Sequence, residues 1–138
     1  MALDQKLVVH FRDGIVMKGT SLNFSPNRDT FHFTVIASPT SHHEPVEVKF
    51  SQLKAVFFVK DFTGDKDYHR VKDFSNAPKS PQGRKAMVHC KDGETLYGFI
   101  QGYASDRPGF FIFPVDPQEN NVKIFILQSF VSGLDFPE

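Results

Sequence analysis

The sequence of 138 residues lacks tryptophan, has a single cysteine, Cys90, and has no excess of charge of either sign. One cysteine cannot form an internal disulfide, which is compatible with a reducing cytosol. Sixteen Lys and Arg balance sixteen Asp and Glu, whereas a protein that coats nucleic acid needs a positive excess. The sequence therefore excludes an internal disulfide and disfavours a protein that coats a polyanion.

Long apolar runs are also lacking. No run approaches the roughly 18 to 20 residues of a membrane-spanning helix. Residues 1–6 do not show the basic residues and apolar stretch that begin a secretory signal. Hydrophobic residues nevertheless make up 40% of the chain, which is enough for a packed core. We therefore expect a folded, cytoplasmic protein that does not engage a membrane.

Phenylalanine is abundant, with 16 copies, and several of them belong to an internal repeat. Residues 6–14 match residues 85–93 at an offset of 79. The same offset superimposes three further pairs: Gly19 on Gly98, Arg28 on Arg107 and Phe31 on Phe110. Residues 53–58 match residues 131–136 at an offset of 78. Such a repeat predicts a duplicated structural unit, with copies at about residues 6–60 and 85–136.

The segment between the copies differs in composition. Residues 61–84 contain nine charged residues, two Pro and two Gly, with little apolar periodicity. This composition is typical of a linker or a long surface connection. We therefore divide the chain into a first domain at residues 1–60, a linker at 61–84 and a second domain at 85–138.

The pattern within each copy predicts short strands. Apolar and polar residues alternate along residues 7–12, and Asp13-Gly14 predicts a hairpin turn. A three-residue loop would pair Phe11 with Ile15 and Val9 with Met17, placing apolar residues on one face, with Gly14 in a left-handed conformation. Further strands are expected at residues 30–36, 46–50, 55–59, 109–114, 122–127 and 133–136. No helix longer than a turn or two is expected.

Five short strands in about 55 residues, with a bend at Gly19, predict an all-β fold of two tandem small SH3-like or Sm-like barrels. The Asp13-Gly14 turn, the second Gly and the strand entered through Phe31 resemble the first half of the Sm-like motif. Residues 25–29 and 104–108 replace the Asp and Asn that the Sm-like family has after the second Gly. The resemblance supports the barrel more than an RNA site.

A second resemblance spans nearly the whole chain. Residues 102–117, with their Arg-Pro-Gly-Phe-Phe segment, the Asn pair at 120–121 and residues 54–62 are similar to a bacterial domain family of unknown function. Members of that family occur as small proteins and beside signalling modules. The resemblance implies a bacterial, cytoplasmic protein without an established activity, and it supplies no catalytic residue.

The residues that could bind metal or act as nucleophiles do not form a recognisable site. His42, His43 and Glu44 form the one His cluster, but adjacent residues of an extended chain point to opposite sides and chelate poorly. His10 and His89 occupy equivalent strand positions on the face opposite the core. Cys90 aligns with a core position, where a thiol is inert. No nucleophile elbow, phosphate-binding loop or dinucleotide fingerprint is present. We therefore expect no enzyme activity, no metal and no cofactor.

Polar residues in the predicted loops are candidate ligand contacts. Arg28 and Arg107 each precede a Phe-led strand, and a guanidinium can bind phosphate or carboxylate in a bidentate manner. Alternatively, each Arg closes its own loop. Asn120 and Asn121 are expected to form a turn, although their amides could also contact a ligand.

Two pairs of adjacent Phe residues suggest an interface. Phe57 and Phe58 are neighbours, as are Phe110 and Phe111, and neighbouring strand residues point to opposite faces. One ring of each pair must therefore face away from its own core, toward solvent, the other copy or a partner.

These observations support three functional hypotheses. The first is a non-enzymatic protein-interaction module, associated with bacterial signalling, that binds a protein partner or self-associates. The second is an Sm-like RNA-binding protein. Residues 1–60 have seven basic and five acidic residues and residues 85–138 have four and seven, which disfavours a continuous track for phosphates. The third is a binder of a small anionic ligand, such as a nucleotide, at Arg28 or Arg107.

Overall fold

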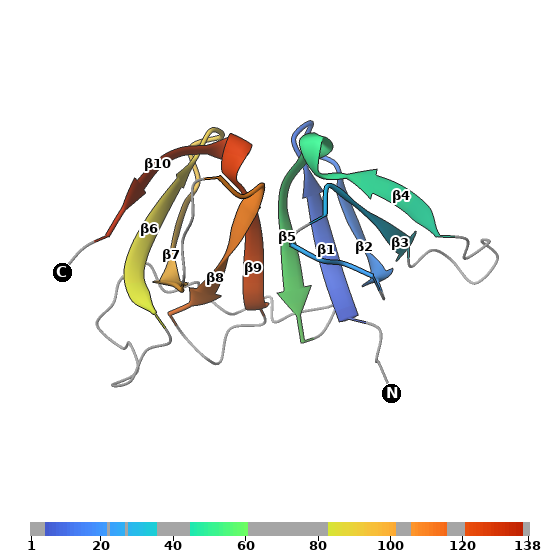
Figure 1. The fold of residues 1–138 in the computed structure, drawn as a ribbon, viewed down its shortest axis with the longest axis horizontal. Coiled ribbons are helices and arrows are strands. Elements are labelled where there is room, and N and C mark those ends of the chain that lie inside the picture. Colours follow the sequence, from blue (N-terminus) through green and yellow to red (C-terminus); the bar gives the residue numbers. More distant parts are fainter. Residues whose placement is uncertain are drawn as a thin grey trace.

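The computed structural model describes residues 5–21, 23–26, 28–35, 45–60, 83–101, 106–115 and 121–136. These residues form ten strands and two short 3-10 turns without an α-helix, so the all-β prediction is confirmed (Figure 1). None of the described segments is a helix long and apolar enough to cross a membrane. Most of the predicted linker, residues 61–82, lies outside the described residues, and Arg84 already belongs to a strand.

The elements fall into two successions of the same kind. The first half contains β1 (Gln5–Phe11), β2 (Val16–Ser21), β3 (Thr30–Val35), β4 (Val46–Lys49), the 3-10 turn η1 (Phe50–Gln52) and β5 (Leu53–Val59). The second half contains β6 (Arg84–Cys90), β7 (Thr95–Ile100), β8 (Gly109–Pro114), β9 (Asn121–Leu127), η2 (Gln128–Phe130) and β10 (Val131–Asp135). The strands predicted from alternation are present, with ends that differ by one or two residues.

The first hairpin has the predicted three-residue loop. Val9 pairs with Met17, and the Phe11 N–H donates to the Ile15 carbonyl at 2.9 Å. Gly14 has a φ of +95° and its counterpart Gly93 a φ of +92°, values that glycine adopts without a Cβ clash. The apolar face of this hairpin is less evenly buried than expected, because Leu7 and Val9 are buried whereas Ile15 is 52% exposed.

All ten strands join into one antiparallel sheet in the order β10-β6-β7-β8-β9-β5-β1-β2-β3-β4. The sheet is open, so the structure does not present the two separate closed barrels of the prediction. The physical reason is the pairing of β5 with β9, which places Val56 opposite Phe125 and joins the halves edge to edge. In Figure 1 the two halves curl away from this central pair of strands.

The strand registers of the two halves coincide. Val9 pairs with Met17 as Val88 pairs with Leu96, and Phe31 pairs with Val48 as Phe110 pairs with Ile126. β1 pairs with β5 as β6 pairs with β10, and one residue is skipped in each case, Lys54 and Ser132. The paired positions of the two halves therefore correspond at the same offsets of 79 and 78 residues that the sequence repeat shows.

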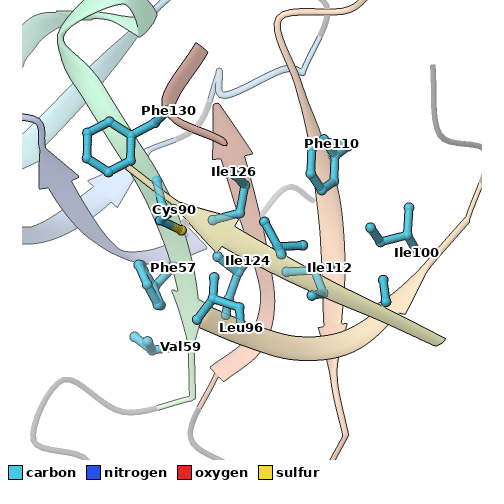
Figure 2. Close-up of a cluster of buried hydrophobic side chains, with 13 residues drawn as sticks. Phe57, Val59, Cys90, Leu96, Ile100, Phe110, Ile112, Ile124, Ile126 and Phe130 are labelled. Carbon is cyan, nitrogen blue, oxygen red and sulfur yellow. The ribbon is translucent and has the colours of Figure 1, made fainter. Parts of the chain in front are cut away.

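The apolar side chains form two clusters, and the central strands contribute to both. β5 is buried along its whole length. Its Ala55, Phe57 and Val59 belong to the second-half cluster, and its Leu53, Val56 and Phe58 belong to the first-half cluster. Figure 2 shows Phe57 and Val59 beside Ile124 and Cys90 of the second half. Each core is thus completed by side chains of the other half.

Gly98 lies where two strands approach closely, and it provides a test of the packing. A Cβ on Gly98 would lie 2.3 Å from the Phe113 carbonyl oxygen. We expect Gly98→Ala to lower the free energy of unfolding by roughly 1–3 kcal/mol, measured by urea denaturation.

The matched control is Gly133→Ala in β10, where the nearest atom to an added Cβ is His89 Cδ2 at 3.6 Å. This variant should retain the stability of the parent chain. An equal loss of unfolding free energy in both variants would contradict the close approach of the two strands at Gly98.

Candidate functional site

The four Phe residues expected at an interface lie inside the chain's own cores. Phe57, Phe58 and Phe110 are 5–6% exposed, and half-buried Phe111 packs against the first-half cluster. Phe57 and Phe111 are the rings that face away from their own halves, and each contacts the core of the other half. Of the alternatives, the structure therefore places these two rings toward the other copy.

The remaining predicted residues are dispersed. Arg28 and Arg107 are exposed in equivalent loops. Arg107 lines a small pocket of about 160 Å³ with Phe110 and Phe111, whereas Arg28 does not line it. Asn121 is the first residue of β9 and pairs with Val59 rather than forming a turn. Asn120 and the His42-His43-Glu44 cluster, which we did not expect to bind metal, lie outside the described residues.

The two equivalent His residues have different neighbours. His10 and His89 are half-buried, as predicted. The His10 ring lies 4.4 Å from the Phe57 ring, between centroids. The His89 Nε2 instead lies 2.8 Å from Asp135 Oδ2.

Cys90 is buried, which confirms its predicted core position. Burial raises the pKa of its thiol to about 11, so the thiolate nucleophile is disfavoured. Cys90, Asp92 and Glu94 present ligand atoms within 4.8 Å of one another, a spacing compatible with a metal ion. A different cation occupies this position, because the Lys54 ammonium lies between the two carboxylates.

Lys54 is the buried charge that the sequence interpretation missed. Its Nζ lies 2.6 Å from Asp92 Oδ2 and 2.5 Å from Glu94 Oε1, although the residue is only 9% exposed. Burial disfavours the charged ammonium, but the hydrogen bonds and charges of Asp92 and Glu94 outweigh burial and raise the pKa of Lys54. The hydrogen bond from Lys54 lowers the pKa of Asp92. The ion pairs of Lys54 with Asp92 and Glu94 thus connect β5 of the first half to the β6–β7 hairpin of the second half.

Arg12 makes a second polar link between the halves. Its Nε donates to the Leu53 carbonyl at 3.1 Å, and its Nη2 donates to Ser129 Oγ. The guanidinium also lies 5.6 Å from the centre of the Phe130 ring. A lone Lys within the apolar run of residues 53–59 was the one sequence signal that could have pointed to this junction.

The counterpart of the Lys54 site in the first half is an open pocket. This edge pocket has a volume of about 390 Å³ and is lined by Phe11, Arg12, Asp13, Ile15, Met17 and Gln52. In the second half the equivalent positions are Cys90, Lys91, Asp92, Glu94, Leu96 and Phe130. Of these, Asp92, Glu94 and Phe130 lie against the Lys54 side chain. The edge pocket lies between the β1–β2 hairpin and Gln52 of η1, the 3-10 turn that follows β4, and β4 is the last strand of the sheet.

The fold and this site define an all-β protein of two equivalent halves with an unfilled pocket at one sheet edge. The chain belongs to a family of unknown function, DUF6982, which matches residues 3–136. The expectation of a domain family of unknown function is therefore confirmed. Comparisons with curated proteins and with solved structures gave no match.

The Lys54 link predicts a stability effect. We expect Lys54→Met to lower the free energy of unfolding by roughly 1–3 kcal/mol, because two neighbouring carboxylates lose their cation. Urea denaturation at neutral pH measures this change, and Lys49→Met, at an exposed residue of β4, is the control that should leave stability unchanged.

A pH series provides a second measurement of the same link. Because the folded-state pKa of Asp92 lies below the ordinary 3.8, its contribution to stability is complete above that value and is lost as the pH falls through the lowered value. The parent chain should therefore lose more stability than Lys54→Met between about pH 4 and pH 2. Parallel profiles would contradict the assignment.

Proposed function

We propose that this protein is a non-enzymatic protein-interaction module that accepts an extended segment of a partner along β4. The observation that carries the proposal is that two equivalent strand edges differ in their pairing. In the second half β9 is covered by β5, whereas among the described residues β4 pairs only with β3. An unpaired strand edge presents N–H and C=O groups to which another strand can bind.

The side chains of β4 support a selective edge. Glu47 and Lys49 are exposed, whereas their counterparts Phe125 and Leu127 are buried between the halves. Charged residues on an edge strand oppose indiscriminate pairing. Val46 of the same strand is nevertheless 45% exposed, so a partner that covers it gains apolar burial.

The proposal extends to the architecture. We propose that the halves are duplicated SH3-like or Sm-like small-barrel units whose facing edges are joined. The order β5-β1-β2-β3-β4 of the first half recurs as β10-β6-β7-β8-β9 in the second, with matching registers. In this arrangement the β9 edge is paired with β5, and the equivalent β4 edge remains available to a strand of a partner.

Two observations support a role without catalysis in a reducing, cytoplasmic compartment. Cys90 is a free, buried thiol with a raised pKa, and Lys54 is held as a charged ammonium. Neither group has the accessible, activated state of a nucleophile. The resemblance to domains found beside bacterial signalling modules is compatible with this role.

Selection of peptides tests the function without assuming their sequence. We expect a displayed library of twelve-residue peptides to yield binders of the full-length chain. These binders should shift the amide resonances of Val46–Lys49 in NMR spectra more than those of Arg84–Cys90 in β6. A library without binders, or binders that shift resonances remote from β4, would contradict the proposal.

Binding of a small anion is a second candidate function, favoured by the position of Arg107 at its pocket. Pro26 of the first half and Arg107 of the second both line this pocket, and a guanidinium suits phosphate. We propose that it accepts a phosphate group of a small ligand.

A thermal-shift series tests this second candidate. Inorganic phosphate or nucleotides at millimolar concentration should raise the unfolding temperature by about 1–3 °C in the parent chain. Arg107→Gln should abolish the shift and Arg28→Gln should retain it. No shift in the parent chain would dismiss the candidate.

A further inference from the structure

We infer that the edge pocket binds a Lys or Arg side chain of the partner segment and that the segment places a large apolar residue three positions later. This inference rests on the proposed function and deepens it, because it names the chemistry of the partner. The second half provides the argument, since the chain itself fills the equivalent position there.

The first step is the equivalence of the two sites. Phe11, Asp13 and Ile15 of the edge pocket stand where Cys90, Asp92 and Glu94 surround Lys54. The backbone agrees as well, since the Arg12 N–H donates to Gln52 at 3.0 Å as the Lys91 N–H donates to Phe130 at 2.9 Å. The edge pocket thus corresponds to the site that binds Lys54 in the second half, but no lysine of the described residues enters it.

The second step is the charge of the pocket. Asp13 Oδ1 accepts the Ile15 N–H at 3.0 Å, and Asp92 Oδ1 accepts the Glu94 N–H at 3.1 Å. Both carboxylates are therefore held in the same way, and Asp92 uses its other oxygen to bind Lys54. Arg12 also lines the pocket, but its guanidinium is directed to the Leu53 carbonyl and Ser129 Oγ, and Asp13 is the one acidic residue among the lining residues.

The third step is the apolar lining. Phe11 and Met17 are half-buried, and Ile15 is 52% exposed. Long aliphatic stems of Lys and Arg cover such surfaces while their charged ends reach a carboxylate. Because Ile15 replaces Glu94, the pocket offers one carboxylate and more apolar surface than the Lys54 site.

The fourth step sets the spacing along the segment. Beyond Lys54, Ala55 pairs with Ile126 and Phe57 pairs with Ile124. The counterparts of Ile126 and Ile124 on β4 are Val48 and Val46. Ile124 is 3% exposed and Val46 is 45% exposed. A partner segment that pairs with β4 in the same register therefore has four successive positions of defined kind. They are a Lys or Arg, a small residue, a residue of any kind and a large apolar residue.

The final step excludes a second copy of this chain as the occupant. The strand equivalent to β5 is β10, which has Ser132 in the place of Lys54 and Asp135 in the place of Phe57. A serine is too short to fill the edge pocket, and Asp135 would lie against the apolar Val46. A different protein with a basic and apolar segment fits the edge better.

Titration with designed peptides tests the inference on the full-length chain. The probe has the sequence of residues 52–59 (QLKAVFFV) between soluble Gly-Ser ends. We expect it to shift the NMR resonances of β4 and of Ile15 and Met17. Replacing its Lys by norleucine, which keeps the stem without the charge, should weaken binding roughly tenfold. Replacing it by Ala should weaken binding further.

Substitution of the protein completes a double-mutant cycle. Asp13→Asn, which retains the oxygen that accepts the Ile15 N–H, should remove the advantage of the Lys peptide over the norleucine peptide. Asp29→Asn, at an exposed residue before β3, should retain that advantage and shows that a general loss of negative charge is not the cause.

The outcomes separate this inference from the function on which it rests. Equal affinities of the Lys, norleucine and Ala peptides, or no binding of any of them, would overturn the cation site. If library peptides without a basic residue still shift the β4 resonances, the strand-accepting function stands without this chemistry. If library peptides also fail, both proposals are wrong.

Discussion

The pairing of β5 with β9 is the interaction on which the rest of the structure depends. It joins two five-stranded halves into one sheet and buries every residue of β5, because each face of that strand meets a different core. Phe57 and Phe58 are adjacent and are both buried for this reason. Without the pairing, Phe57 and Phe125 would each expose a large ring to water.

The same pairing explains the buried charge of Lys54. This residue has no partner in the register between β1 and β5, and its side chain reaches the hairpin of the second half. Two carboxylates receive the ammonium, so the cost of removing it from water is offset by close opposite charges. Polar links at Lys54 and Arg12 therefore join the halves beside the apolar residues of the two shared cores.

Local patterns were sufficient for the secondary structure. Alternation along residues 7–12 and the glycine after Asp13 predicted the strand, the loop length and the register, because these features depend on neighbours in sequence. The position of Cys90 in a core followed from the repeat. The single continuous sheet did not follow, since Val56 and Phe125, which pair with each other, are separated by half the length of the chain. The partners of Lys54 were hidden for the same reason, because Asp92 and Glu94 look like ordinary hairpin residues.

Divergence between the halves also has a consequence for assembly. The β5–β9 junction is heterologous, and among the described residues β4 and β10 each pair with one strand only, so they carry the two complementary edges that could repeat the junction from chain to chain. Such a repetition would produce a fibre or a ring. Glu47 and Lys49 on one edge, and Gly133 and Asp135 on the other, replace the apolar residues of the junction. These four residues do not provide the apolar contacts of the β5–β9 junction, so they disfavour its repetition from chain to chain.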